Sequence, residues 1–153
     1  MFRIRRIFDD VSVVNKEIIK KVGQLLKINF PDINPAEIDG FASRLTNPFL
    51  NKFDTILFIA EKGKHQVAGF AILMLDPVLE FAFLDWIATG RDLKNRGIGG
   101  ALYETIRKEI ISRNYDGIFL NVSQTIRNFV HHPKSVSLML KDCGFMKNMV
   151  QDL

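Results

Sequence analysis

Hydrophobic residues recur every three or four positions in several stretches of the chain, which is the period of a helix with one buried face. Asp9 or Asp10 can cap the first of these stretches, and Asn34 followed by Pro35 is a typical start of the second. Gly144 is a typical residue after the end of the last stretch. The predicted helices cover residues 10–28, 35–45, about 97–113 and about 134–143.

Shorter apolar runs that are rich in β-branched and aromatic residues, and bounded by turn residues, predict strands. These strands cover residues 55–60, 67–75, 79–88 and 115–122. The polar turn 61–66 joins the first two strands into a hairpin, and Asp76-Pro77 turns the chain into the third. A strand, a helix and a strand then follow from 79 to 122, which predicts a parallel, right-handed crossover. The fold class is therefore α/β (α+β), with a mixed sheet in which an antiparallel meander precedes a strand-helix-strand crossover.

The composition is that of an ordinary globular domain. The chain has 153 residues and is 47% apolar, so one domain, residues 1–153, can bury a core of its own. The net charge is +4, but no dense basic tract is interleaved with aromatic residues, and we expect no nucleic-acid partner. No run of 18 apolar residues and no secretory signal is present, which predicts a cytoplasmic protein without a membrane partner. A single cysteine, Cys143, and three histidines exclude an internal disulfide and a Cys/His metal site.

A glycine-rich loop between a predicted strand and a predicted helix carries the main chemical signal. Backbone without Cβ atoms can approach a bulky anion closely, and the N–H groups of a first helical turn have no partner within the helix. The helix dipole and two cations of the loop add positive charge, so a pyrophosphate would fit there. The loop consists of Lys94, Asn95, Arg96, Gly97, Ile98, Gly99 and Gly100.

Two common phosphate-binding motifs do not match this loop. No Gly-Lys-Ser/Thr follows a glycine at the Walker spacing, and the dinucleotide fingerprint would need a glycine where Leu102 stands. A purely structural turn, in which the glycines bind nothing, is an open alternative.

The loop resembles motif A of the GCN5-related N-acetyltransferases (GNAT), which reads Arg/Gln-x-x-Gly-x-Gly/Ala at the start of a helix. Here Lys94 takes the first position, and Gly97 and Gly99 take the two glycine positions. The order of the predicted elements also resembles that family over nearly the whole chain. The resemblance implies a sheet with helices on both faces, acetyl-CoA (coenzyme A) as the coenzyme, and a pyrophosphate bound by the loop.

The same resemblance implies where the reaction takes place. The pantetheine arm would pair with the backbone of Ile87, Ala88 and Thr89, and one of their N–H groups would polarise the thioester carbonyl. An amine acceptor must lose a proton, so a base is expected on the strand before the loop. Asp85 is the first candidate and Glu80 the second. Asp85 as a polar residue that only faces solvent is an equal alternative.

The end of the chain departs from the family pattern. Family members commonly have a tyrosine in the final helix that protonates the departing thiolate, and Leu140 takes that position here. After Phe145 too few residues remain for the usual closing C-terminal strands. The sheet then ends early or borrows a strand from a partner chain, which makes a homodimer an open alternative.

The sequence is consistent with two functions. The first is an N-acetyltransferase in which a primary amine, on a small molecule or a protein, attacks acetyl-CoA directly. The second is a catalytically impaired acyl-CoA-binding or regulatory interaction domain. The opening residues 1–10, together with 97–104, also resemble the acetyltransferase module that precedes a deacetylase domain in some bacterial two-domain proteins.

Overall fold

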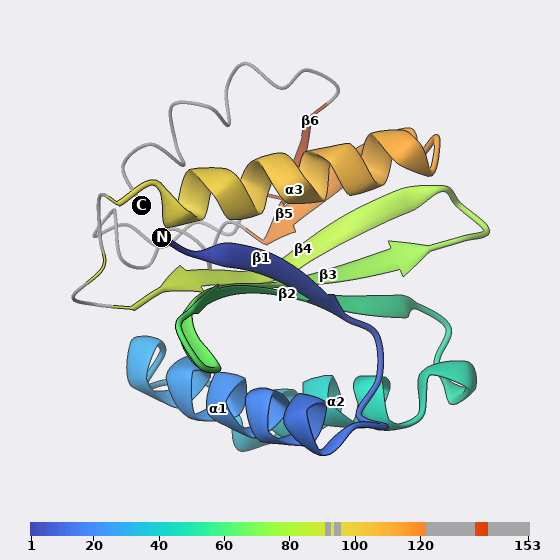
Figure 1. The fold of residues 1–153 in the computed structure, drawn as a ribbon. Helices are drawn as coiled ribbons and strands as arrows, with labels where there is room; N and C mark the ends of the chain where they lie inside the picture. The colour runs from blue at the N-terminus through green and yellow to red at the C-terminus, as the bar shows by residue number, and fades with distance from the viewer. Residues whose placement is uncertain (91–92, 94–95, 122–136, 141–153) are drawn as a thin grey trace.

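One mixed sheet lies between two helical layers in the computed structural model, which describes residues 1–90, 93, 96–121 and 137–140 (Figure 1). The helices α1 and α2 cover one face of the sheet, and α3 covers the other (Figure 1). The elements, in chain order, are β1 (Arg3–Ile7), α1 (Val13–Asn29), α2 (Pro35–Thr46), η1 (Pro48–Leu50), β2 (Asp54–Lys62), β3 (Gln66–Asp76), β4 (Phe81–Thr89), α3 (Ile98–Ser112), β5 (Gly117–Asn121) and β6 (Ser137–Leu140). The predicted fold class, including helices on both faces, is confirmed.

The strands of the sheet follow their order in the chain, β1-β2-β3-β4-β5-β6. All neighbouring strands are antiparallel except β4 and β5, which run parallel and are joined through α3. The antiparallel meander and the strand-helix-strand crossover are therefore both as predicted. The crossover places the N-terminus of α3 directly after the loop that leaves β4.

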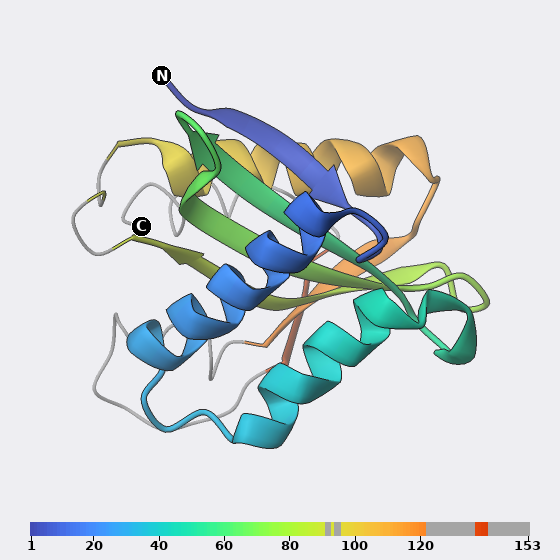
Figure 2. The ribbon, with the colours of Figure 1, turned by 60° about the horizontal axis from the view of Figure 1, so that its bottom comes forward.

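The first two helices begin at side-chain caps. Ser12 Oγ accepts the Asn15 N–H at 3.0 Å at the start of α1, so the cap is Ser12 and the prediction of Asp9 or Asp10 was wrong. Asp9 instead accepts the N–H of Val11 through its carboxylate. Asn34 caps α2 as predicted, with Pro35 in the first turn. Figure 2 shows α1 and α2 lying side by side and antiparallel across the sheet, and none of the described helices is long and apolar enough to cross a bilayer.

The sheet separates two hydrophobic cores. Alternation along β2 sends Phe58 and Ala60 toward α3, and Leu57 and Ile59 toward α1 and α2. All four side chains are fully buried. A sheet that is covered on both faces needs apolar residues at successive positions, which explains the unbroken apolar run in this strand.

β1 was not predicted, because its sequence Arg3-Ile4-Arg5-Arg6-Ile7 is mostly charged. The structure pairs these charges with carboxylates on other elements. Arg3 Nε donates to Glu61 Oε2 at 3.0 Å, and Arg5 Nη2 lies 3.6 Å from Glu61 Oε1. Arg6 Nε lies 3.0 Å from Glu109 Oε2 on α3. The edge strand is thus held to β2 and to α3 by ion pairs as well as by its backbone ladder.

The predicted helix near 134–143 was wrong over Ser137–Leu140, which form β6. This strand pairs antiparallel with β5, with Leu138 opposite Leu120 and Met139 opposite Phe119. Leucine and methionine favour helices in isolation, but a partner strand that needs its ladder completed overrides such local preferences. Residues 134–136 and 141–143 of the predicted helix lie outside the described residues.

Candidate active site

An opening in the sheet begins halfway along β4. β5 pairs with β4 only from Phe81 to Leu84, whereas β3 pairs with β4 as far as Thr89. The register between β3 and β4 shifts at this point, so that Asp85 is an extra, bulged residue between Leu84 and Trp86. Beyond the bulge the outer edge of β4 has no partner strand among the described residues (Figure 2). Backbone N–H and C=O groups of β4 therefore face a gap in which an extended ligand could pair with them.

The N-terminus of α3 lies beside the end of this gap. Gly97 is the N-cap, with φ of 74°, a left-handed conformation that an L-residue adopts only with strain. The first bond of the helix runs from the Ala101 N–H to the Gly97 carbonyl at 3.0 Å. Within the described residues, no acceptor is found for the amide groups of Ile98, Gly99 and Gly100. The helix thus presents unbonded donors and the positive end of its dipole.

Open space lies beside two of the glycines in this turn. A Cβ atom added at Gly97 or Gly100 would meet no atom within 4 Å, and both Arg96 and Gly97 are exposed. At Gly97 and Gly100 the turn is therefore not closed off by side chains of the described residues. A diphosphate group fits such a cradle, because it needs room, N–H donors and a nearby cation.

Gly69 in β3 sets how closely α3 approaches the sheet. A Cβ atom added there would lie 2.9 Å from Ile98 Cγ2 and 3.1 Å from the Ala88 carbonyl oxygen. No side chain fits between the first turn of α3 and the strands beneath it. Gly90 N–H also donates to Ala68 O at 2.9 Å, which ties the end of β4 to β3. Through these contacts the start of the loop and the start of α3 both pack against β3.

The remaining predicted coenzyme residues lie on either side of this loop. Ile87, Ala88 and Thr89 are at most 9% exposed, so only their backbone can face the gap. Lys94 and Asn95 lie outside the described residues. The backbone of β4 and the N-terminus of α3 are thus brought together.

Asp85 points toward α2, where it is held by an ion pair. Arg44 Nη2 donates to Asp85 Oδ2 at 3.1 Å, and each side chain is about one-fifth exposed, at 21% and 20%. Burial raises the pKa of the Asp85 carboxyl above its ordinary value; the Arg44 guanidinium acts in the opposite direction, and the negative charge of Glu37 raises the pKa further. A carboxylate with a raised pKa accepts a proton more readily than a free one.

Glu80 is not brought near Asp85. It is exposed in the turn between β3 and β4, with φ of 54°, and its carbonyl oxygen accepts the Asp116 N–H at 2.8 Å. Five residues of extended strand separate the two carboxylates, which corresponds to roughly 16 Å. Glu80 also lies at the end of the sheet opposite to Gly97.

Sequence reasoning missed Arg44, Glu37 and Gly69. An isolated glycine in an apolar strand is a recognised sign of close backbone approach, so Gly69 could have been found. Nothing local links Arg44 to Asp85, because 41 residues separate them and only the packing of α2 on the sheet brings them together.

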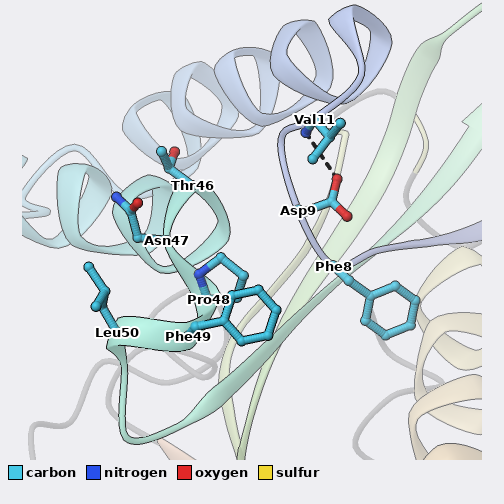
Figure 3. A pocket seen from close by; sticks show the side chains of 8 residues that line it. All are labelled: Phe8, Asp9, Val11, Thr46, Asn47, Pro48, Phe49 and Leu50. Carbon is cyan, nitrogen blue, oxygen red and sulfur yellow. Dashed lines mark hydrogen bonds between the residues drawn. The ribbon is translucent and has the colours of Figure 1, made fainter.

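A separate cavity of about 430 Å³ lies at the other end of the sheet (Figure 3). The residues around it are Phe8, Asp9, Val11, Thr46, Asn47, Pro48, Phe49 and Leu50. Its single carboxylate, Asp9, accepts a hydrogen bond from the Val11 N–H at 3.0 Å (Figure 3). This cavity is distant from the loop and is mostly apolar. Among the residues that the structure describes, no group of His, Cys, Asp and Glu side chains could hold a metal ion.

Comparison with known proteins agrees with this geometry. The sequence model of the acetyltransferase (GNAT) family matches residues 21–145. Among curated proteins, sequence comparison finds no significant match.

Solved structures share the fold at low sequence identity. Tetrahymena GCN5 has a TM-score of 0.68 at 14% identity, with 88% of this chain and 83% of that chain covered. The catalytic domain of the Tetrahymena GCN5 histone acetyltransferase in complex with coenzyme A has a TM-score of 0.62 at 11% identity, with 91% of each chain covered. The ribosomal-protein-S18-alanine N-acetyltransferase from Escherichia coli has a TM-score of 0.54 at 22% identity, with 78% of this chain and 66% of that chain covered.

At these identities the solved structures establish the fold alone, whereas the family model matches well over half of the sequence. The glycine-rich turn into α3, the parting of β4 and β5 and this match agree with one another, and the chain belongs to the acetyltransferase (GNAT) family.

Proposed function

We propose that the protein is an N-acetyltransferase that transfers the acetyl group of acetyl-CoA to a primary amine. One observation carries the proposal: the N-terminus of α3 at Gly97, whose amide groups have no acceptor among the described residues, lies at the end of the edge of β4 that no described strand pairs with. This arrangement suits a ligand that has a diphosphate at one end and an extended arm with amide groups at the other. Coenzyme A is such a ligand, and when bound its acetyl form supplies a thioester.

The chain's own residues hold the diphosphate at one end of the gap. The amide groups of Gly97, Ile98, Gly99 and Gly100 donate hydrogen bonds to it, and Arg96 adds a positive charge. Lys94 and Asn95 belong to the same loop and are proposed to contribute further donors. The backbone of Ile87, Ala88 and Thr89 pairs with the extended arm, and one N–H polarises the carbonyl of the acetyl group.

Asp85 is proposed as the base that receives the proton of the acceptor amine. An amine with a pKa near 10.4 is almost fully protonated at pH 7, so it needs an acceptor for its proton before it can attack. Asp85 lies at the bulge where the gap begins, and its Oδ2 is held by Arg44. Within the described residues Oδ1 receives no hydrogen bond, which leaves this atom to accept the proton. Glu80 is the weaker candidate because of its distance from the gap.

The names of structural neighbours bear on the class of acceptor. The names of two structural neighbours describe a histone acetyltransferase and an enzyme that acetylates an alanine of a ribosomal protein. A protein amino group and a small-molecule amine therefore both remain within the proposal. The resemblance of residues 1–10 and 97–104 to an acetyltransferase module that precedes a deacetylase domain stays a prediction.

A non-catalytic acyl-CoA-binding domain is the second candidate. It is favoured by one observation, namely that the position at which the family commonly has a tyrosine is Leu140, which lies in the strand β6 and has no hydroxyl group. Loss of that acid slows release of the thiolate but leaves the phosphate cradle unchanged.

Thiol release in the presence of acetyl-CoA and a panel of amines tests the proposal. Asp85→Ala should lower turnover by about 10²–10⁴-fold, the usual contribution of a general base, while thermal stabilisation by coenzyme A persists. Stabilisation without thiol release for any amine would identify the binding domain instead. If coenzyme A at 100 times its expected dissociation constant gave no stabilisation, where about 2.7 kcal/mol is expected, both functions would be excluded.

A further inference from the structure

Three phenylalanine rings form a continuous strip on the face of the sheet that α1 and α2 cover only in part. Phe81 and Phe83 are two residues apart on β4, and Phe119 lies opposite Phe83 on β5. The Phe119 ring centroid is 5.2 Å from that of Phe81 and 5.0 Å from that of Phe83, with the latter pair stacked at 22°. Their neighbours Ala82 and Ile118 belong to the core beneath α3, so the rings point to the opposite face.

The strip is not part of either hydrophobic core. Phe83 is 38% exposed and the other two rings are partly exposed, although aromatic residues in the centre of a sheet are normally buried. The helices cover this face as far as Trp86, whose ring packs edge-on against Phe30 at 4.6 Å. The first half of β4 and β5 lie beyond that cover. An aromatic surface in this position is available to a ligand.

The strip ends at the proposed base. Phe81 and Phe83 share one face of β4 by alternation, about 7 Å apart, and the bulged residue Asp85 points to the same face, where it contacts α2. Arg44 contacts Asp85 from α2, and the charge of Glu37 on the same helix also acts on Asp85. The aromatic rings, Asp85 and Arg44 are thus brought together where the gap between β4 and β5 begins.

We propose that the acceptor is a primary amine attached, through a spacer of about two carbon atoms, to an aromatic or large apolar group that stacks on Phe83 and Phe119. This inference rests on the proposed function. With the nitrogen beside Asp85, a spacer of this length places the apolar group over the Phe83 ring about 7 Å further along the strand. A free arylalkylamine and an amine carried by an apolar protein segment present the same chemistry, and the experiment separates them.

Charge also limits the acceptor. A diamine or polyamine would place its second ammonium group either over the rings, where it forgoes the stacking and apolar burial of an aryl group, or next to Arg44, whose like charge repels it. An amine with a single positive charge beside Asp85 avoids both costs. The strip therefore favours amines that carry one charge.

The test compares three small amines: 2-phenylethylamine, n-propylamine and 1,4-diaminobutane. For the wild-type protein we expect kcat/KM with 2-phenylethylamine to be about tenfold higher than with either of the others, since a stacked aromatic pair contributes up to about one power of ten. Phe83→Ala should abolish this preference by lowering kcat/KM for 2-phenylethylamine about tenfold. Phe49→Ala is the matched control, because Phe49 is an exposed phenylalanine, 99% accessible, in the distant cavity.

A binding measurement keeps the inference testable if no amine is turned over. Calorimetric titration of 2-phenylethylamine into the protein saturated with coenzyme A should then give about tenfold weaker binding for Phe83→Ala than for Phe49→Ala. Discrimination in binding without turnover would refute the proposed enzyme and support the aromatic site. Equal values for the three amines, preference for 1,4-diaminobutane, or no effect of Phe83→Ala in either assay would overturn the inference.

The same panel distinguishes the source of the amine. A peptide whose N-terminal residue is phenylalanine should match 2-phenylethylamine if the site accepts protein termini. If the free arylalkylamine alone is used, the acceptor is a small molecule. If neither is turned over, the calorimetric comparison of Phe83→Ala with Phe49→Ala decides the inference.

Discussion

Replacing Gly69 with alanine is expected to destabilise the protein, because α3 lies directly on the backbone of β3 at this point. The new Cβ atom would lie 2.9 Å from Ile98 Cγ2 and 3.1 Å from the Ala88 carbonyl oxygen. Favourable contacts between carbon atoms lie near 3.5–4.0 Å, so the first turn of α3 would have to retreat by roughly 0.8 Å. Overpacking of this kind costs about 1–3 kcal/mol.

Part of that cost is offset in the unfolded state. Alanine restricts the unfolded chain more than glycine does, which stabilises by about 0.4–1 kcal/mol where the native backbone is compatible. The net loss should therefore be about 1 kcal/mol, which corresponds to a fall in Tm of about 2–4 °C for a chain of this size. Urea unfolding followed by circular dichroism measures the change in the free energy of unfolding directly.

Gly40→Ala supplies a control of opposite sign. Gly40 lies in the middle of α2, and a Cβ atom added there would meet nothing within 4 Å. Alanine at this site should stabilise the protein by about 0.5–1 kcal/mol through helix propensity. If Gly69→Ala were as stable as Gly40→Ala, the close packing of α3 on β3 would be refuted. If the proposed coenzyme site is correct, Gly69→Ala should also weaken coenzyme A binding.

Three further predictions concern other parts of the molecule. Gly97→Ala and Gly63→Ala each force alanine into a left-handed conformation, at φ of 74° and 62°. Each substitution should lower the free energy of unfolding in urea by about 1–2 kcal/mol. Only Gly97→Ala should also weaken coenzyme A binding in a thermal-shift titration. Burial alone would raise the pKa of Glu61, but its hydrogen bonds and ion pairs more than offset burial, and the pKa is lowered. The ionised Glu61 therefore stabilises the fold at pH above its ordinary pKa, and this stabilisation is lost as pH falls through the lowered pKa. Glu61→Gln should make the fall in urea midpoint below about pH 4.5 less steep. Arg44→Met removes a charge that lowers the pKa of Asp85, and should move the acidic limb of kcat/KM against pH to higher pH, whereas an unmoved limb would remove Asp85 from the role of base.

Features that depend on neighbours in the sequence could be predicted. The helix α3 was expected over 97–113 and is found over Ile98–Ser112, because its apolar period and its glycine start are both local signals. The hairpin of β2 and β3 follows from two apolar runs and the polar turn between them. The glycine-rich loop was recognised for the same reason.

Features that depend on distant partners could not be predicted. The residues of β1 are mostly arginines, and their role as an edge strand becomes clear only when Glu61 and Glu109 are placed beside them. The sequence of β6 would suit a helix equally well, and the ladder of β5 decides between the two. The contact between Arg44 and Asp85 depends on how α2 packs across the sheet. Local patterns thus predicted the strand, loop and helix around Gly97, but not Arg44 and Glu37, which act on Asp85.

The parting of β5 from β4 at Leu84 has a consequence for how acceptor preference can change. Up to Leu84, β4 is hydrogen-bonded to a strand on each side, so only its side chains can contact a ligand. After it, the same strand shows only main-chain atoms, whose hydrogen-bonding capacity does not depend on side-chain identity. If the proposed sites are correct, substitutions at Phe81 or Phe83 should change the preferred acceptor without altering the backbone groups that would bind the coenzyme.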